Sequence, residues 1–352
     1  MEQGTGPRKR FRTPPEGAQV SVIDVARAAG VSTATVSRVL NGVTTVAEDA
    51  VQRVRRACRD LNYIPNGAAR ALSSRRTRTI GAVVPSIENS GFAVAIGALQ
   101  RWLDAAGYTL FVASSDYDPI AELRECSLLM ARGIDGLLLV GGEHHPELVP
   151  MLEHQELPFV ETWTLSDTHP CVGFDNVEAA RRLTEYLLDL GHVDIGVIAG
   201  RMLHNDRAAN RVAGVRQALE ARGLKLPAEW MIERPYRILE GRLAMRSLLA
   251  RATRPTAVIC GNDQLAFGAL IEAKESGLSV PEDISVTGFN DLDFAAYLDP
   301  PLTTISVPAD NIGVTAGEYL VNRSNGKAVL RVNEIQTRLV VRSSTGRVRS
   351  IQ

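Results

Sequence analysis

The chain has 352 residues, of which 45% are hydrophobic and 22% charged. This composition is that of a soluble protein of two or three folding units, and it argues against disordered, collagen-like and membrane proteins, because no apolar run approaches the roughly 18 residues that a spanning helix needs. Residues 1–79 carry 14 Lys and Arg against 6 Asp and Glu, whereas the remainder carries 25 against 34. A basic head on an acidic body is typical of DNA-binding proteins, since phosphate neutralisation supplies most non-specific affinity for DNA. A solvated basic tail would give the same charges, so charge alone leaves both interpretations open.

No targeting segment, metal site or cofactor site is predicted. The basic residues near the N-terminus are not followed by an apolar stretch, so we expect no secretory signal, no membrane association and a cytoplasmic, nucleoid-associated protein. The four cysteines have neither zinc-site nor disulfide-framework spacing. We expect all four to be reduced core residues: Cys58, Cys126, Cys171 and Cys260.

The pattern of apolar residues changes twice along the chain. Residues 1–17, rich in Gly and Pro, predict a flexible arm, and residues 18–64 predict a small helical domain with helices at about 23–29, 33–40 and 47–61. From residue 80, short apolar runs alternate with amphipathic stretches, which indicates parallel sheets flanked by helices. Strands are expected at 80–84, 109–113, 136–140, 159–161, 195–198, 257–260 and 284–288, and helices at 93–105, 121–132, 178–190, 208–222, 239–251 and 264–276. These strand–helix units are more than one compact sheet usually contains, and we therefore expect two sheets with a cleft between them.

The segment DVARAAGVSTATVSRVLNG, residues 24–42, predicts a helix-turn-helix. Gly30 permits the positive φ that ends the first helix, Ser32 can cap the second, and Val31 and Val36 fill the angle between the helices. In this geometry the second helix enters the major groove of double-stranded DNA. Its leading side chains are the candidates for base and backbone contacts: Thr33, Ala34, Thr35, Ser37 and Arg38. The alternative is an ordinary helical hairpin.

The third helix should close the small core of this domain. Val51, Val54, Cys58 and Leu61 recur at helical spacing, which predicts that they face inward. Four arginines on the other faces of this helix are expected to be mostly solvated, with one or two of them near phosphates.

The helix-turn-helix segment and several later motifs resemble the LacI/GalR family of bacterial repressors. The later motifs are LNYIPNGAARALSS, GIDGLLLVGG, CGNDQLAFGAL, VPEDISVTGFNDLD and PPLTTI, so the resemblance spans residues 20–342. It implies a homodimer on a pseudo-palindromic operator and a two-lobed α/β core similar to periplasmic sugar-binding proteins. We place this core at 80–345, with lobe 1 at about 80–176 and 307–336, lobe 2 at about 177–306 and 337–345, and a tail at 346–352.

Residues 65–79 are predicted to be a hinge between the head and the core. Pro65 suits the first turn of a helix, but a helix this short is unstable alone, and Gly67 weakens it further. The resemblance implies that Leu72 wedges between base steps in the minor groove, a contact that kinks DNA. It also places Asn41, Asn66 and Ala69 at the DNA. The alternative is a plain flexible linker.

The resemblance also implies an effector cleft formed by the loops that follow the strands. The residues that match cleft positions are Phe92, Trp163, Asp175, Arg207, Arg211, Tyr236, Asn262 and Asn290. Amide and guanidinium groups would bind hydroxyls or a carboxylate, and aromatic rings would cover apolar ring faces. Ordinary packing of the three aromatic residues and a surface position for Arg211 remain alternatives. Asp263 could serve as a helix N-cap.

Two departures from the family pattern bear on the effector. Many sugar-binding members have Asp where Asn290 stands, and the loop at 201–210 is one residue longer than in several relatives. Losing an anion while Arg207 and Arg211 stay nearby makes the cleft more positive. We therefore expect the small polar metabolite to be a sugar acid or another hydroxylated anion rather than a neutral sugar.

The leading interpretation is a repressor of a carbohydrate or sugar-acid utilisation operon, with the effector either an inducer or a corepressor. A solute receptor would share the core but not the helix-turn-helix. An enzyme is not indicated, since GxGxxG, P-loop, HExxH and GxSxG motifs are all lacking. The pair His144 and His145 precedes a helix and is expected to be solvated. The segment after Arg338 has no leucine heptads, so a tetramer through a helical tail is not expected.

Overall fold

The computed structural model describes residues 20–40, 45–64 and 76–349. These residues belong to two compact units that divide after Thr77, a small helical head and a large α/β core. No helix within the described ranges is long and apolar enough to cross a membrane.

The head consists of three helices, α1 (Val22–Ala29), α2 (Thr33–Leu40) and α3 (Glu48–Asp60), within one residue of the predicted bounds. A capping box starts α1, because the Ser21 hydroxyl accepts from the Asp24 N–H and the Asp24 carboxylate accepts from the Ser21 N–H. Gly30 ends this helix with a φ of 65°. The Ser32 hydroxyl then accepts from the Thr35 N–H at 3.1 Å, as the sequence predicts for the cap of α2.

The core of the head forms where the three helices meet. Val25, Val36 and Val54 are fully buried there, with small alanines that allow the helices to approach closely. Ala57 also lies in this core, whereas the predicted core residues Val51 and Cys58 are only half-buried.

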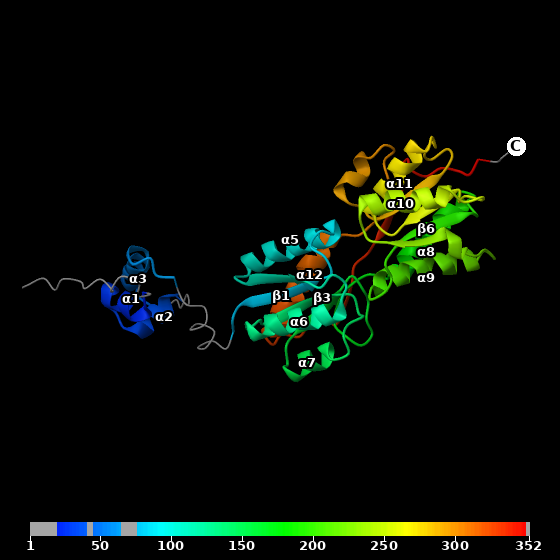
Figure 1. Cartoon of the computed structure of the whole chain (residues 1–352). Coiled ribbons are helices and arrows are strands. Elements are labelled where there is room, and N and C mark those ends of the chain that lie inside the picture. The colour runs from blue at the N-terminus through cyan, green and yellow to red at the C-terminus, as the bar shows by residue number, and fades with distance from the viewer. Residues whose placement is uncertain (1–19, 41–44, 65–75, 350–352) are drawn as a thin grey trace, which may run out of the picture. The chain divides into compact units, whose positions relative to one another are not determined.

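The larger unit contains two six-stranded sheets (Figure 1). The first has the order β11-β5-β4-β3-β1-β2, and each neighbouring pair is parallel. We call this sheet with its helices lobe 1. Its elements are β1 (Thr79–Val84), α5 (Ser90–Ala105), β2 (Thr109–Ser114), α6 (Pro119–Ala131), β3 (Gly136–Val140), α7 (Leu148–His154), β4 (Phe159–Thr162), β5 (Cys171–Gly173), α12 (Ala309–Ser324) and β11 (Val332–Glu334).

Lobe 2 is built on the second sheet, of order β12-β10-β9-β8-β6-β7, in which only β12 is antiparallel to its neighbour. Its elements are α8 (Asn176–Asp189), β6 (Ile195–Gly200), α9 (Asp206–Glu220), η1 (Ala228–Trp230), β7 (Met231–Arg234), α10 (Ile238–Leu249), β8 (Ala257–Cys260), α11 (Asp263–Glu275), β9 (Ser285–Asn290), η2 (Asp293–Tyr297), β10 (Thr303–Ser306) and β12 (Arg338–Val340). The two lobes form one compact unit.

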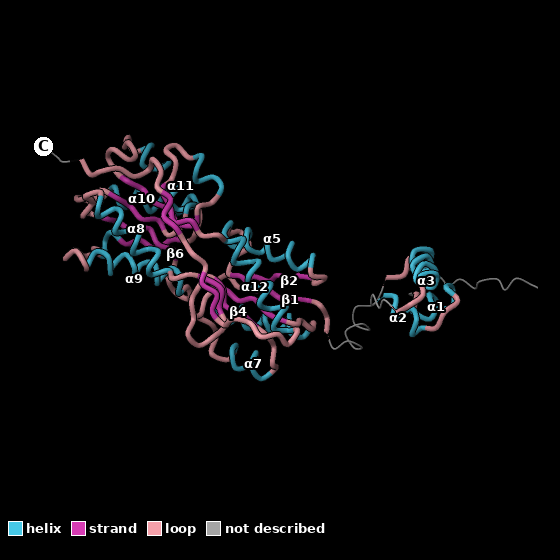
Figure 2. Tube along the Cα trace, turned by 180° about the vertical axis from the view of Figure 1, so that it is seen from behind, coloured by secondary structure: helices cyan, strands magenta, loops and turns pink. Residues whose placement is uncertain are grey.

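Helices cover both faces of each sheet, as Figure 2 also shows for lobe 1. Along β3, Leu138 and Val140 pack in the cluster that includes α5 and α12, whereas Leu137 and Leu139 pack in the cluster of α6 and α7. This alternation follows from the two-residue period of a strand and explains why β3 is apolar throughout. In lobe 2, α8 and α9 share one cluster and α10 and α11 another.

The predicted two-sheet α/β core is confirmed, and each strand and helix that the sequence predicts lies within three residues of an observed one. The sequence-based prediction omitted the strands β5, β7, β10, β11 and β12 and the helices α7 and α12. The omitted strands have only three or four residues, and three of them, β7, β11 and β12, contain no fully buried residue, so they lack the apolar run by which the equally short β4 and β8 were predicted. The helix α12 was missed because Gly313 and Gly317 lie inside it.

Candidate functional site: a polar pocket between the lobes and an exposed recognition helix

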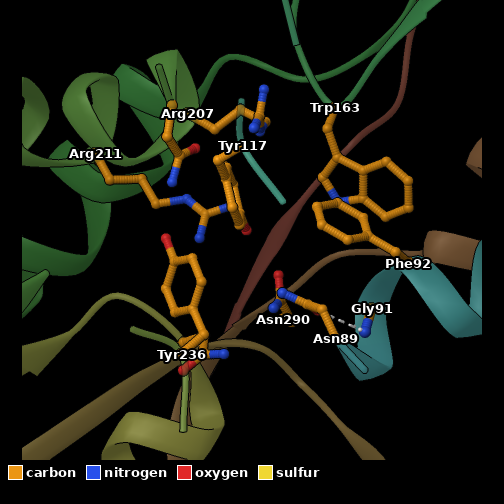
Figure 3. Close-up of a pocket in the computed structure, with 11 residues that line it drawn as sticks. Asn89, Gly91, Phe92, Tyr117, Trp163, Arg207, Arg211, Tyr236 and Asn290 are labelled. Carbon is orange, nitrogen blue, oxygen red and sulfur yellow. Dashed lines mark hydrogen bonds between the residues drawn. The ribbon is translucent and has the colours of Figure 1, made fainter. Parts of the chain in front are cut away.

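The pocket lies between the lobes, at the carboxyl ends of the strands, where ligands bind in open α/β sheets (Figure 3). It has an open space of about 350 Å³. Lobe 1 contributes the start of α5, the loop after β2 and Trp163 after β4, and lobe 2 contributes the start of α9, the loops after β7 and β8 and the end of β9. The lining residues are Asn89, Gly91, Phe92, Tyr117, Trp163, Asn205, Arg207, Arg211, Tyr236, Asn262 and Asn290.

Arg211 is the central cation of the pocket. Its Nε–H donates to Asn176 Oδ1 at 2.9 Å and its Nη1 donates to the Gly261 carbonyl at 2.8 Å. Its guanidinium carbon lies 3.8 Å from the ring centroid of Phe289. No ion pair found within the described ranges involves Arg211. Burial lowers the pKa of Arg211 and the charge of the nearby Asp263 opposes this, but a guanidinium stays charged in proteins, so the pocket holds a cation that has no direct ion-pair partner in the described part of the chain.

Asn176 positions both Arg211 and Trp163. While its Oδ1 accepts from Arg211, its Nδ2 donates to the Trp163 carbonyl at 2.9 Å, and only 3% of the residue is exposed. The sequence-based prediction selected the neighbouring Asp175 instead. Asp175 is exposed, caps α8 by accepting from the Glu178 N–H at 3.0 Å, and does not line the pocket.

Arg207 lines the pocket but differs from Arg211 in its partners. Its Nη1 forms an ion pair with Asp206 Oδ1 at 2.6 Å and donates to the Val140 carbonyl of lobe 1 at 3.1 Å. Its charge is therefore compensated within the protein, and one of its nitrogens is occupied by a contact between the lobes.

Aromatic rings form two walls of the pocket. Phe92 and Trp163 meet edge to face with centroids 5.0 Å apart, and both are almost fully buried. In Figure 3, Tyr117 and Tyr236 lie beside the Arg211 guanidinium, across from this pair. Tyr117 and Trp163 both have positive φ, at 62° and 63°. Non-glycine residues in this conformation are often found at ligand sites, where the surrounding structure holds them.

Amide side chains supply the remaining polar groups. Asn262 is also the N-cap of α11, since its Oδ1 accepts from the Leu265 N–H at 2.9 Å. The predicted alternative of Asp263 as this cap is therefore wrong. Asp263 instead accepts from the Leu292 N–H at 2.7 Å and from the Thr304 hydroxyl at 2.6 Å, which anchors the loop that follows the pocket residue Asn290. Burial raises the pKa of Asp263 to about 6.

The structure thus brings seven of the eight predicted cleft residues into one pocket and leaves out Asp175. It adds four lining residues that the sequence-based prediction missed, namely Asn89, Gly91, Tyr117 and Asn205. Asn89 and Gly91 lie at the N-cap and the start of α5, where the loop after β1 ends, and the loops after the strands were expected to form the cleft. Tyr117 had no sequence signal, because its position depends on the backbone turn after β2.

The predicted recognition helix presents polar side chains to solvent. Thr33, Ala34, Ser37 and Arg38 are exposed and Thr35 is half-buried, whereas Val36 is the only fully buried residue of α2. The remaining predicted DNA contacts, Asn41, Asn66, Ala69 and Leu72, lie outside the described residues.

A second polar cluster lies in lobe 1, next to the pocket, and corrects one prediction. His144 was expected to be solvated, but its side chain is only 4% exposed, and its Nδ1 donates to Glu122 Oε2 at 2.8 Å. Nearby, His169 Nδ1 donates to Glu161 Oε1 at 2.7 Å. Within the described ranges, no group of His, Cys, Asp and Glu has the arrangement of a metal site. The four cysteines carry no disulfide, and three of them are buried.

A helix-turn-helix head joined to a two-lobed α/β core with a polar pocket defines the class of DNA-binding regulators that sense small molecules. Residues 21–66 match the sequence profile of bacterial regulatory proteins of the lacI family, and residues 77–343 match that of periplasmic binding proteins and the sugar binding domain of the LacI family. The chain therefore belongs to the LacI family of bacterial transcriptional regulators.

Individual relatives agree with this assignment. The chain is 36% identical over 330 residues to the HTH-type transcriptional repressor PurR of Vibrio campbellii, covering 92% of this chain and 98% of the relative. Among solved structures, it resembles the lac repressor dimer bound to operator and the anti-inducer ONPF, with a TM-score of 0.84, 29% identity and coverage of 94% and 100%. It also resembles the transcription regulator GntR of Chromobacterium violaceum, with a TM-score of 0.72, 32% identity and coverage of 76% and 99%. Such relatives are regulators, not enzymes.

Proposed function

We propose that this regulator is a repressor that binds a pseudo-palindromic operator as a homodimer and responds to a hydroxylated anion, such as a sugar acid. Repression and operator binding are supported by the relatives named repressors, and dimerisation by the likeness to the lac repressor dimer bound to operator. The control of a carbohydrate or sugar-acid operon is the narrower part of the proposal.

The observation that carries the effector class is the charge of the pocket. Two arginines and no carboxylate stand among its lining residues in the described part of the chain. Arg207 forms an ion pair with Asp206, whereas Arg211 has no direct ion-pair partner in the described part of the chain, and two of its five N–H groups are bound to the protein. A carboxylate bound to the remaining N–H groups would neutralise the buried charge through charge-assisted hydrogen bonds. The amides and the aromatic rings suit a hydroxylated body attached to this acid group.

Calorimetric titration with matched pairs tests this class of effector. Gluconate against glucose and galacturonate against galactose differ mainly in the acid group, and we expect heat of binding from acids only. Arg211→Gln should weaken the binding of the acid by about tenfold or more, because it removes a charged donor. Arg216→Gln is the matched control, since Arg216 is an exposed arginine of the same helix. Selective binding of the neutral sugars would contradict the proposal.

The exposed face of α2 supports the proposed DNA contacts. We infer that Thr33, Ala34, Thr35, Ser37 and Arg38 lie against bases and backbone in the major groove, with Asn41 beside them and the hinge residues Asn66, Ala69 and Leu72 in the minor groove. Selection of duplexes from a randomised pool, followed by fluorescence anisotropy, tests this assignment. Ser37→Ala and Arg38→Ala should reduce affinity for the selected duplex more than Arg56→Ala does, because Arg56 lies on α3 and pairs with Asp60.

A further inference from the structure

The first two residues of α9 bind the end of β3 in the other lobe. Asp206 Oδ2 accepts from the Gly142 N–H at 3.0 Å, and Arg207 Nη1 donates to the Val140 carbonyl at 3.1 Å. The ion pair between Asp206 and Arg207 joins these two bonds into one unit. Because Arg207 also lines the effector pocket, this unit connects the pocket to the relative position of the lobes.

The backbone of β3 is shaped for this contact. Gly141 has a φ of 89°, and a Cβ placed on it would lie 1.7 Å from Arg207 Nη1 and 2.6 Å from Asp206 Oδ1. A side chain at this position would displace the ends of the Asp206 and Arg207 side chains. The positive φ and these two contacts together favour glycine at residue 141.

The cluster beside this contact carries an unbalanced set of charges. Three carboxylates, Glu122, Glu161 and Asp206, lie near one permanent cation, Arg207. A Cβ placed on Gly142 would lie 3.4 Å from Glu161 Oε2 and 3.8 Å from Asp206 Oδ2. Oxygens of these two carboxylates therefore both lie close to Gly142. Two histidines contact these carboxylates, His144 beside Glu122 and His169 beside Glu161, and a proton on His144 adds a positive charge to the set.

His144 has carboxylates on both sides of its ring. Its Nδ1 donates to Glu122, and its Nε2 lies 3.8 Å from Glu161 Oε1 without a hydrogen-bond partner in the described part of the chain. An ionised carboxylate cannot donate a hydrogen bond, so the lone pair of an unprotonated Nε2 would face the lone pairs of Glu161. A proton on Nε2 removes this repulsion. Burial by itself lowers the pKa of His144, but the bond to Glu122 and the charges of Glu161 and Asp206 outweigh it, so the pKa is raised.

The proton affinity of the cluster depends on Asp206. Burial raises the pKa of Glu161, His144 and His169 lower it, and Asp206 raises it again. Other groups that face the cluster are Cys126 on α6 and Cys171 on β5, both neutral thiols whose pKa values burial raises. When α9 leaves β3, the charge of Asp206 leaves the cluster, and the cluster then holds its protons less tightly. By linkage, protonation of the cluster favours the contact between the lobes.

We propose that Asp206 and Arg207 form a clasp that holds the two lobes together at the effector pocket, and that the buried histidine–glutamate cluster beside it sets the strength of the clasp through its charge. The clasp is tight when His144 is protonated, and it loosens as rising pH leaves the carboxylates of the cluster without a counter-charge. Arg207 is then a positioning residue rather than a group that neutralises the effector. This proposal does not depend on which effector the pocket binds.

Hydrogen exchange of the full chain, followed by mass spectrometry of the peptide around Gly142, tests the clasp directly, because the Gly142 N–H is one of its bonds. Asp206→Asn removes the charge and keeps the shape, and we expect exchange of this peptide to be about tenfold faster than in the unmodified protein at the same pH. Gly141→Ala should have the same effect by displacing Arg207. Asp189→Asn is the control, since Asp189 is an exposed carboxylate at the end of α8 that pairs with Arg222. Unchanged exchange in both clasp variants would overturn the clasp.

The same peptide tests the role of the cluster. Below the ordinary pKa of histidine, His144→Gln should exchange about tenfold faster than the unmodified protein, and the two should converge at a pH well above the raised pKa of His144, where the unmodified His144 has lost its proton. His154→Gln on α7 replaces an exposed histidine of the same lobe and should follow the unmodified protein throughout. Glu122→Gln provides a second variant: it removes one of the three carboxylates, so at high pH its clasp should be tighter, and its exchange slower, than in the unmodified protein. A difference that stays the same at both pH values, or no difference for either variant, would overturn the role of the cluster charge.

Discussion

At the scale of single residues, the buried Asp263 carboxyl shows how the pocket depends on groups behind it. Asp263 is fully buried, and it holds the Leu292 N–H and the Thr304 hydroxyl. Directly before Leu292 stand Asn290 and Asp291, whose φ values of 116° and 60° are unusual for non-glycine residues. The free energy that keeps Asn290 in the pocket therefore comes partly from Asp263, which does not line the pocket itself.

Replacement of this carboxyl should make stability depend differently on pH. The pKa of Asp263 is about 6 in the folded protein and 3.8 ordinarily, so its ionisation disfavours folding. The protonated Asp263 contributes fully to stability at a pH below 3.8, the pKa of this group in the unfolded chain. This contribution is lost as pH rises through the pKa of about 6 in the folded protein. Relative to Asp263→Asn, the free energy of unfolding of the unmodified protein should fall by at most about 3 kcal/mol between about pH 4 and pH 7.

Urea unfolding of both proteins at several pH values measures this difference. Comparison with Asp263→Asn cancels the pH dependence of all other groups. A difference between the two proteins that does not change with pH would show that Asp263 keeps an ordinary pKa.

Asn176 offers a second test at this scale. Asn176→Ala removes the acceptor of the Arg211 Nε–H and the donor to the Trp163 carbonyl, which leaves buried polar groups unpaired. We expect the free energy of unfolding to drop by about 1–3 kcal/mol and the binding of anionic ligands to weaken. Asn322→Ala, which removes a bond to Lys327 near the surface, should change stability by less than about 0.5 kcal/mol. Equal effects of the two variants in urea unfolding would contradict the positioning role of Asn176.

The sequence predicts pocket residues better than it predicts their supports. Phe92, Arg211 and Asn262 follow predicted strands or begin predicted helices, so their place in the cleft follows from the topology. Asn176 and Tyr117 could not be assigned in this way, because their roles depend on contacts and backbone conformations that form only in the folded chain. His144 illustrates the same limit, since its partner Glu122 lies on another element.

At the scale of elements, α12 is held by a close contact between helices. A Cβ on Gly313 would lie 2.1 Å from the Ala95 carbonyl of α5, so the two backbones approach too closely for any side chain. The helix propensity of this segment is poor, and packing against α5 compensates for it. This explains why the sequence predicts α5 and misses α12.

Two glycine substitutions should therefore have opposite effects. Gly313→Ala forces α5 and α12 apart and should lower the free energy of unfolding by about 1–3 kcal/mol. Gly97→Ala within α5 meets only the end of the flexible Arg101 side chain at 3.4 Å, and it should raise that free energy by up to about 1 kcal/mol through helix propensity. Thermal unfolding followed by circular dichroism compares the two. Destabilisation of the same size by both would mean that the contact of α12 with α5 is not the cause.

At the scale of the whole molecule, charge and fold divide the chain in the same way. Residues 1–79 contain 14 of the 39 Lys and Arg residues and only 6 of the 40 Asp and Glu residues. The head has its own buried core, and the core unit has two sheets with a pocket between them. A change at the pocket can reach the DNA only through a difference in effector affinity between two arrangements of the molecule.

Fluorescence anisotropy of the full chain with its selected duplex tests this account most directly. Nanomolar binding is expected at low salt, with affinity that falls linearly on a logarithmic salt scale as phosphate contacts release counterions. Arg38→Ala should weaken this binding, and a bound sugar acid should shift it in the unmodified protein but not in Arg211→Gln. A purified, folded protein that does not bind any selected duplex at low salt would contradict the account.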